Sequence, residues 1–502
     1  MVVAFAAVLI VRWHSHYSNT DDFLYALQTQ GYYDGLRDGP GGLLDAWREF
    51  GTNTPLMPTL ALPVAPASTS PHVLVLVQIV PLLVLVAGVR VLLGGLGVEQ
   101  RAAWVATAAI ATLAPVLAYA AMWHFAPAPT ASTVWAVAAY ARSDRLARPK
   151  SALLLGLALG VLSLTRVMAP VYIVALAVPI AIDVLSSGQG RLHRMRNGAG
   201  AALVAVLAAA PWWLTTGETA FDYLRSSGYE QGVFTRETSL LDRAIDRLEW
   251  TADETGWLLA LLLVALAAWA LVCVVRRVPG WRLLAVLLGA VVVGMAFLAT
   301  SSNLGTAFAL PFVVLLACAA VPALLRLGRP LRTMALAASC AVLAVSLVAL
   351  TGALPKTTVA DHRLWNEALP GVEQARAVLR CDDCRPPDSE QLAEQVLAVI
   401  GERPTLVVRD DALLNAEGLR HVASERDRSA DLSPPAGGAT VPPAQLARVD
   451  YVLTGLTVGP YHPGVDLGGL DARMRAAGFR PVLNRRLSAW NTVTVWAAPS
   501  RR

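Results

Sequence analysis

Long apolar runs alternate with short polar segments along residues 1–352 of the chain. Ten of the runs approach the ~20 residues that a helix needs to cross the hydrocarbon core of a bilayer. They lie at roughly 73–96, 101–122, 127–141, 151–165, 167–185, 199–214, 255–275, 283–301, 306–325 and 333–352. Because the runs are long and carry few charges, we expect ten membrane-spanning helices there.

The opening run, Met1–Val11, is apolar but only about half the required length. It allows three interpretations: a signal peptide, a short helix, or a helix whose start lies upstream of this Met. A signal peptide needs a basic segment before the apolar run and a small-residue cleavage site after it, and neither is seen. We therefore expect an eleventh transmembrane helix that is truncated at its cytosolic end.

The short loops fall into two sets that differ in basic residues. Lys and Arg number 14 in the loops 97–101, 142–150, 186–198, 276–282 and 326–332. The loops at 123–126, 166 and 302–305 contain only Arg166. Basic residues accumulate in cytosolic loops, so the first set is expected in the cytosol. The long segments 12–72 and 215–254, and everything after 353, are then exoplasmic.

The segment 355–502 has a different character. Strand-like runs at Thr405–Arg409, Tyr451–Leu453 and Thr492–Trp496 are each bounded by turn-forming residues. Helical patterns occur near 362–380, 388–400 and 467–477. The predicted fold is therefore a mostly α polytopic membrane protein with about 11 transmembrane helices in residues 1–352, plus an exoplasmic α/β domain in residues 355–502.

Composition supports a membrane protein and argues against a nucleic-acid partner. The 502 residues are 55% hydrophobic and 15% charged, with a mean hydropathy of +0.52. Soluble domains carry about a quarter charged residues. The net charge of +5 is explained by arginines clustered in the short loops, where membrane topology accounts for them.

Two adjacent carboxylates, Asp21-Asp22, follow the first apolar run by about ten residues and begin a long polar loop. A carboxylate next to the bilayer can act as a general base on an acceptor hydroxyl, and a like-charged neighbour raises its pKa. The alternative is structural: Asp is favoured at the N-cap and in the first turn of a surface helix. Further along the loop, residues 43–50 have the pattern of a short helix lying in the membrane interface.

Several segments resemble the GT-C superfamily, the polytopic glycosyltransferases that use polyprenyl-phosphate sugars. The nearest branch contains protein mannosyltransferases and aminoarabinose transferases (glycosyltransferase family 39-like). It has an acidic pair followed by Tyr after the first helix, as in Asp21-Asp22-Phe23-Leu24-Tyr25. Three further segments are similar: Thr54-Pro55-Leu56-Met57-Pro58, Gly156 to Gly160 with Arg166 following, and Pro211-Trp212-Trp213. The resemblance covers the layout of residues 1–352.

The resemblance implies inverting displacement at the anomeric carbon of a lipid-linked sugar. Asp21 would accept the proton of the acceptor, while Asp22 would support it or help to hold a divalent metal ion. Arg166 would bind the donor phosphate, although an interfacial anchor is the alternative role for this arginine. The substrate pocket would include Tyr25, His124 and Trp212. A packed or solvated neutral histidine is the simpler interpretation of His124.

One segment departs from the family pattern. Many members have a basic residue and a Tyr before a Pro in the outer turn between the ninth and tenth helices. Here Phe308 replaces the Tyr and the cation is missing, which leaves Asn303 as a weaker phosphate ligand. Donor binding would then depend on Arg166, or on Arg225 or Arg236. Most charges of the loop 215–254 are expected to form a solvated face, namely Glu218, Asp222, Glu230, Glu237, Asp242 and Asp246.

The sequence therefore predicts a plasma-membrane glycosyltransferase. It would move a sugar from a polyprenyl-phosphate carrier to an exoplasmic acceptor, which could be a glycan, a lipid or a protein. The alternative is a transporter or lipid-carrier flippase, which would usually show paired halves and mid-membrane ionisable residues. A third possibility is a degenerate member that has lost catalysis and uses its C-terminal part for binding.

Overall fold

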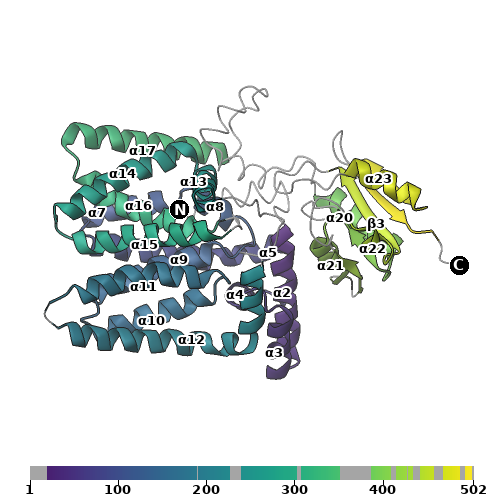
Figure 1. Ribbon diagram of the computed structural model, residues 1–502, viewed down its shortest axis with the longest axis horizontal. Coiled ribbons are helices and arrows are strands. Elements are labelled where there is room, and N and C mark those ends of the chain that lie inside the picture. The colour runs from purple at the N-terminus through teal and green to yellow at the C-terminus, as the bar shows by residue number, and fades with distance from the viewer. Residues whose placement is uncertain are drawn as a thin grey trace.

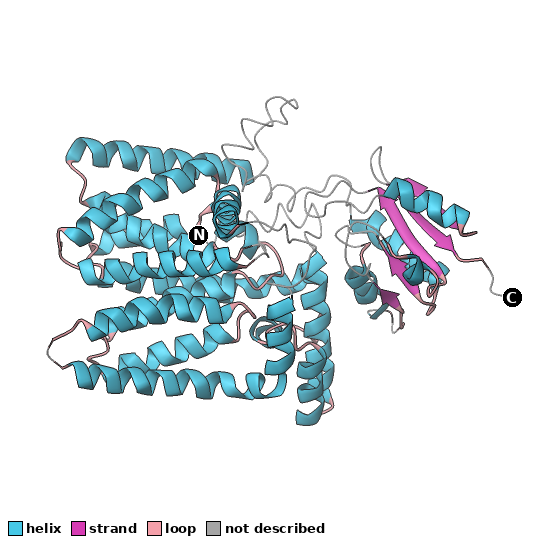
Figure 2. Cartoon of the chain, viewed as in Figure 1, coloured by secondary structure: helices cyan, strands magenta, loops and turns pink. Residues whose placement is uncertain are grey.

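The structure, a computed structural model, shows a helical bundle and a separate unit built on a β-sheet (Figures 1 and 2). It describes residues 20–188, 190–226, 239–301, 307–350, 386–408, 414–424, 426, 428–433, 441–456, 467–486 and 492–499. The predicted first helix, Met1–Val11, and the helical pattern at 362–380 lie outside these residues.

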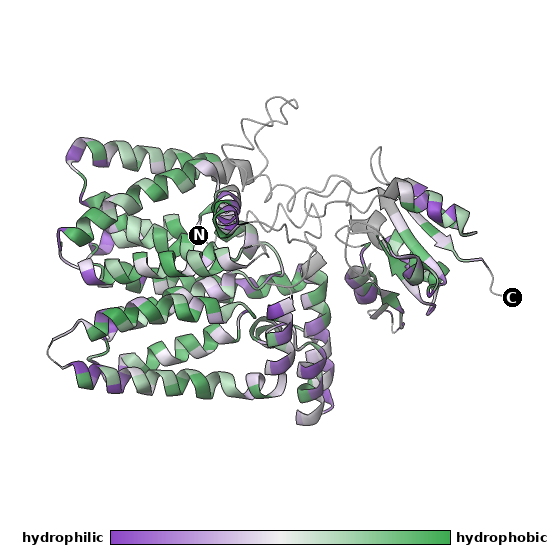
Figure 3. Cartoon of the chain, in the orientation of Figure 1, coloured by the Kyte–Doolittle hydropathy of each residue, from purple (hydrophilic) through white to green (hydrophobic). Residues whose placement is uncertain are grey.

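Each of the ten predicted apolar runs corresponds to helix. The helices are α6 (Ile79–Gly95), α7 (Gln100–Ala111), α8 (Ala114–Ala120), α9 (Pro127–Arg142), α10 (Pro149–Ser163), α11 (Ala169–Leu185), α12 (Arg191–Arg225), α14 (Trp257–Val275), α15 (Trp281–Thr300), α16 (Leu310–Leu325) and α17 (Arg329–Leu350). α6 is preceded by α5 (Pro71–Leu74) and η1 (Val75–Gln78). Hydropathy colouring shows that most residues of these helices are apolar and that hydrophilic residues gather mainly near the helix ends (Figure 3).

Length and composition allow some of these helices to cross a membrane alone. Among the described residues four are long and apolar enough: Pro71–Gly95, α12, α14 and α15. A fifth span results if α7 and α8, which are bent by 57°, are counted together. The bend lies beside Pro115, in the first turn of α8, where the missing N–H interrupts the hydrogen-bond ladder. The chain is an integral membrane protein, and the total of eleven spans stays a prediction.

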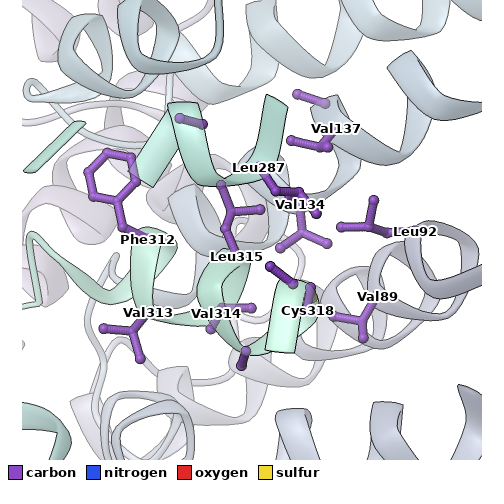
Figure 4. Packing of buried hydrophobic residues seen from close by; sticks show 14 of the residues in the cluster. Val89, Leu92, Val134, Val137, Leu287, Phe312, Val313, Val314, Leu315 and Cys318 are labelled. Carbon is purple, nitrogen blue, oxygen red and sulfur yellow. The ribbon is translucent and has the colours of Figure 1, made fainter. Parts of the chain in front are cut away.

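The core of the bundle lies where α6, α9, α15 and α16 meet. Val89 and Leu92 of α6 pack there with Val134 of α9, Leu287 of α15 and Leu315 of α16 (Figure 4). These side chains are fully buried, so the bundle is closely packed in its interior. Apolar side chains on the outside, such as Leu203 and Val264, are more than half exposed, as expected of a surface that faces lipid.

Four further helices lie across one end of the bundle (Figure 1). They are α2 (Thr20–Arg37), α3 (Pro40–Glu49), α4 (Leu56–Ala61) and α13 (Leu240–Thr255). α3 coincides with the short interfacial helix predicted at 43–50, but Phe50 at its end packs on α2. A Cβ added to Gly31 of α2 would lie 2.6 Å from the Phe50 ring. Part of the apolar face predicted for lipid therefore contacts protein.

The sheet of the C-terminal unit lies between two hydrophobic cores, one on each face. Its strand order is β2 (Leu432–Ser433), β1 (Thr405–Val407), β3 (Tyr451–Leu456), β5 (Thr492–Ala497) and β4 (Arg480–Arg486). β1 is parallel to β2 and β3, whereas the β3–β5 and β5–β4 pairs are antiparallel. Val407 and Leu453 face α20 (Pro386–Ile400) and α21 (Ala416–Ser424). Their chain neighbours Leu406 and Val452 face α22 (Pro443–Leu446) and α23 (Leu467–Ala476), because successive strand side chains alternate.

The three runs predicted as strands coincide with β1, β3 and β5, although β1 ends at Val407 rather than Arg409. The helices predicted at 388–400 and 467–477 coincide with α20 and α23. Sequence reasoning did not find α21 or β4. β4 carries three arginines and alternates poorly, so its sequence lacks the period-2 pattern that marks a half-buried strand.

Candidate functional site

The Asp21-Asp22 pair lies in the first turn of α2, which begins at Thr20. Their side chains are outside the described part of the structure, but the neighbouring turn is described. Tyr25, one turn later, is buried, and its ring centroid lies 4.6 Å from that of Phe125 and 5.8 Å from that of His124. The start of α2 therefore lies against the loop that joins α8 to α9.

The loop is held rigidly around His124. The backbone N–H of Ala126 donates to His124 Nδ1 at 3.1 Å, which assigns the proton of the neutral ring to Nε2. The Gln78 amide donates to the carbonyl oxygens of Met122, at 2.9 Å, and of His124. Tyr119 also stacks near the His124 ring, with 5.6 Å between centroids. His124 is thus a packed histidine whose ring lies next to that of Tyr25.

Arg166 lies in the turn between α10 and α11, and two features fix that turn. First, α10 packs tightly on α12, because a Cβ on Gly156 would overlap the Ala201 carbonyl oxygen. Close approach through small residues is a common way to pack membrane helices. Second, the N–H of Leu56 donates to the Leu164 carbonyl at 3.1 Å. The Pro-rich segment around α4 therefore clamps the chain two residues before Arg166.

The Arg166 side chain is only 6% exposed and lies against two aromatic rings. Its guanidinium carbon is 4.4 Å from the Phe125 centroid and 4.0 Å from the Phe308 centroid. Such cation–π contacts strengthen as the cation loses water. The anchor interpretation requires an arginine that reaches the aqueous interface, so this burial favours a binding role for Arg166.

A second buried arginine, Arg247 of α13, reaches the same phenylalanine. It is 1% exposed, and its guanidinium carbon is 5.9 Å from the Phe308 centroid. Burial lowers the pKa of the guanidinium to about 10, so Arg247 stays protonated at neutral pH. The opposite face of α13 exposes Leu241, Ile245 and Leu248. Arg247 is therefore directed to the protein interior, whereas Asp242, Asp246 and Glu249 of the same helix are exposed.

Glu254, at the end of α13, joins these groups. Its Oε1 accepts hydrogen bonds from the Tyr119 hydroxyl at 2.9 Å and from the Ala307 N–H at 2.8 Å. Burial raises the pKa of this carboxyl above its ordinary value, although the hydrogen bonds and the charges of Arg247 and Arg166 oppose the rise. Ala307 has φ 59°, a conformation that L-residues rarely adopt and that clusters at functional sites.

Sequence reasoning did not single out Arg247 or Glu254 among the charges of the loop 215–254. The signal was present in their spacing. Arg243, Arg247 and Glu254 are four and then seven residues apart, so they lie on one side of an α-helix. Arg243 also connects α13 to the end of α15, because its guanidinium donates to the Thr300 carbonyl at 2.9 Å.

Of the other candidate residues, the structure describes Trp212 and Arg225, and neither contacts the Arg166 group. Trp212 is buried, but its indole lies beside the hydroxyl of Tyr32, about 10 Å along α2 from Tyr25 at the helical rise. Arg225 is exposed near the end of α12. Arg236 and Asn303 lie outside the described residues. In the part of the chain that the structure describes, no group of three or more His, Cys, Asp or Glu side chains could hold a metal ion.

The fold is GT-C-like, as the resemblance implied. Two solved structures share it: ArnT from Cupriavidus metallidurans bound to undecaprenyl phosphate, and the same protein in the apo state. Both have a TM-score of 0.63 and cover 98% of this chain and 96% of their own, with 13% and 14% sequence identity. No family model and no curated protein matches the sequence. At this identity the likeness establishes a shared fold.

Proposed function

We propose that this chain is a membrane glycosyltransferase that moves a sugar from a polyprenyl-phosphate carrier to an exoplasmic acceptor. One observation carries the proposal: two buried arginines, Arg166 and Arg247, converge on Phe308 at the end of the bundle where α2 begins. Two neighbouring buried cations favour binding of an anion, and a phosphate offers both charge and a geometry that suits guanidinium groups. The structural neighbour bound to undecaprenyl phosphate supports a lipid phosphate as that anion.

In this proposal Arg166 and Arg247 bind the phosphate of the donor. Their charge is worth more at a buried site than in water, because the effective dielectric constant is lower there. The phosphate is the leaving group, so stabilising its negative charge lowers the barrier to breaking the sugar–oxygen bond. Arg247 would thereby supply the cation that the outer turn at Asn303 lacks. Arg225, which is exposed, would not contribute.

Asp21 would be the base. It would take the proton of an acceptor hydroxyl while the acceptor oxygen attacks the anomeric carbon from the face opposite the phosphate. The bond from that carbon to the phosphate oxygen breaks, the carrier leaves as polyprenyl phosphate, and the configuration inverts. Asp22 would support Asp21 through like-charge coupling. A chain of ring contacts links this turn to the arginines: Tyr25 touches Phe125, and Phe125 lies under Arg166.

The proposal includes the membrane arrangement. Eleven spans in residues 1–352 would place the arginines at the exoplasmic face of the plasma membrane. The C-terminal unit, residues 355–502, would be an exoplasmic α/β domain. The distribution of basic residues in the short loops supports this orientation, because Arg166 is the one Lys or Arg in the short loops on the opposite side.

A transporter or flippase fits the structure less well. The buried acidic and basic side chains of the described helical bundle are Arg166, Arg247 and Glu254 at one end and Asp183 near the end of α11. Asp183 is paired with Arg145 at 2.7 Å and Arg282 at 3.2 Å. A substrate path would require ionisable groups near the middle of the helices.

A direct test uses the purified full chain with a radiolabelled polyprenyl-phosphate sugar. We expect the wild type to release or transfer the labelled sugar. The Asp21→Asn variant should lose this activity while its elution profile in size-exclusion chromatography stays unchanged. Release from none of a panel of donors would reject the glycosyltransferase. Movement of the intact labelled carrier from one leaflet of the vesicle membrane to the other, with no loss of its sugar, would favour the flippase.

A further inference from the structure

The C-terminal unit is seated on α2, the helix that begins with the Asp21-Asp22 pair (Figure 1). The contact comes from α21. The ring of His421 lies 5.5 Å from the ring of Phe23, measured between centroids. Two turns further along α2, the Gln30 amide donates to the Ser424 hydroxyl at 2.6 Å. The two elements are separated by about 390 residues in sequence, so the contact is tertiary.

Phe23 belongs to the core of the C-terminal unit rather than to the core of the bundle. It is 0% exposed and packs in the cluster that contains Leu419 of α21 and Val495 of β5. Only two residues later, Tyr25 packs in a different cluster, with Met57 of α4 and Trp123. The first turn of α2 is therefore held between two separate bodies.

The spacing along α2 explains how one helix serves both bodies. Phe23 and Gln30 are seven residues apart and so lie on one face. Tyr25 and Tyr32 are also seven apart and lie on a second face, about 200° around the helix from the first. Each face is fixed at two points, which restricts both the tilt and the rotation of α2.

We propose that Phe23 and His421 are positioning residues through which the C-terminal unit orients the Asp21-Asp22 turn for transfer. This inference rests on the proposed function. The first turn of a helix has few intrahelical hydrogen bonds and frays readily. Phe23 immediately follows the acidic pair, so its burial in the C-terminal unit fixes the backbone where the base is carried. A misplacement of about 1 Å in a reacting group can cost roughly a hundredfold in rate.

The test compares ring removal with ring retention at the contact, in the full chain. We expect His421→Ala to lower kcat by about tenfold or more while the donor KM changes less than about twofold, because the base moves and the phosphate site does not. His421→Phe keeps a ring against Phe23 and should retain most of kcat. Met474→Ala is the matched control, because Met474 packs in the core on the other face of the same sheet.

The outcome that overturns the inference is an equal loss of kcat in His421→Ala and Met474→Ala, or no loss in His421→Ala. A loss confined to donor KM would overturn it as well. If His421→Ala fails to fold, a cysteine pair at Gln30 and Ser424 provides a second measurement. The oxidised pair should hold the docked state and keep wild-type kcat, whereas inactivity that reductant reverses would show that the unit must leave α2.

The two proposals fail in different ways. If the wild type transfers no sugar from any polyprenyl-phosphate donor, the proposed function is wrong. If the wild type transfers sugar but the variants at the α2–α21 contact behave like the control, only the positioning role is wrong.

Discussion

The carboxylate of Glu254 accepts the backbone N–H of Ala307 at 2.8 Å and so ties the end of α13 to the residue before Phe308. Phe308 is the ring over which Arg166 and Arg247 meet. Its carbonyl accepts from the Tyr172 hydroxyl at 3.0 Å. The position of this ring thus depends on hydrogen bonds from two elements, and the left-handed backbone of Ala307 is maintained by one of them.

Removing the Glu254 carboxylate should loosen the arginine site. In Glu254→Ala the Ala307 N–H and the Tyr119 hydroxyl lose their acceptor, at a cost of about 1–3 kcal/mol for each buried polar group left unsatisfied. We expect a lower melting temperature and a higher donor KM. Glu254→Gln keeps an oxygen in place and should retain more of both. If Glu254→Gln lost as much as Glu254→Ala, the charge of the carboxylate rather than its hydrogen bonds would account for both effects.

The same carboxylate predicts a pH dependence of stability. Burial raises the pKa of folded Glu254 above the ordinary value of 4.5. Between that value and the raised pKa the folded state binds more protons than the unfolded state, so its stability falls as pH increases. The difference in melting temperature between wild type and Glu254→Gln should therefore shrink or reverse from low to neutral pH. A difference that is independent of pH would contradict the raised pKa.

Loss of either buried arginine should impair use of the donor. For Arg166→Ala we expect donor KM to rise by about tenfold or more, with the acceptor KM little changed, because charge-assisted hydrogen bonds are worth about 1.5–3 kcal/mol. Arg247→Ala should act in the same direction. Arg225→Ala is the matched control, since this arginine is exposed. Equal losses in donor and acceptor use would return Arg166 to the role of an anchor.

Substitution of the proposed base should affect the chemical step. Removing a general base typically costs about 10²–10⁴ in rate, so Asp21→Asn should lower kcat on that scale without changing the melting temperature. Asp22→Asn should cause a smaller loss. Single-turnover measurements separate this effect from product release. Full activity of Asp21→Asn would leave the acidic pair with its structural role at the start of α2.

Two glycines allow a stability test of the α10–α12 contact that supports Arg166. A Cβ on Gly156 would overlap the Ala201 carbonyl, whereas a Cβ on Gly200 would meet Leu153 at 3.8 Å, an ordinary contact. Gly156→Ala should destabilise the protein by about 1–3 kcal/mol through overpacking. Gly200→Ala should be neutral or slightly stabilising, because Ala favours helix over Gly by about 1 kcal/mol. Thermal unfolding in detergent measures both.

The apolar helices were predictable because a bilayer requires about 20 apolar residues per span, and that requirement is visible in sequence. The residues at which the helices end were less predictable. The run at 199–214 stops where polar residues begin, yet α12 continues to Arg225. A helix beyond the membrane needs no apolar run, so hydropathy cannot mark its end. This is why Trp212, placed at the outer end of a span, in fact lies within a helix and against α2.

The site was predictable only in part. Arg166 stood out because it was the one Lys or Arg in the short loops on the side that disfavours positive charge. Arg247 did not, because its loop contains many charges and its burial depends on contact with the distant backbone of Leu298 and the ring of Phe308. The docking of α21 on Phe23 was beyond sequence reasoning, since nothing local to α2 distinguishes a phenylalanine buried by its own bundle from one buried by a remote unit.

The two-sided burial of the α2 start has a consequence for biosynthesis. The pocket that receives Phe23 includes Val493 of β5, roughly 470 residues downstream, and domains generally form in order of synthesis. While the ribosome is still making the intervening helices, the beginning of α2 has only its bundle-side partners. The membrane part can therefore insert and assemble before the start of α2 is secured, and the nascent chain reaches its final form only when that late strand joins the sheet.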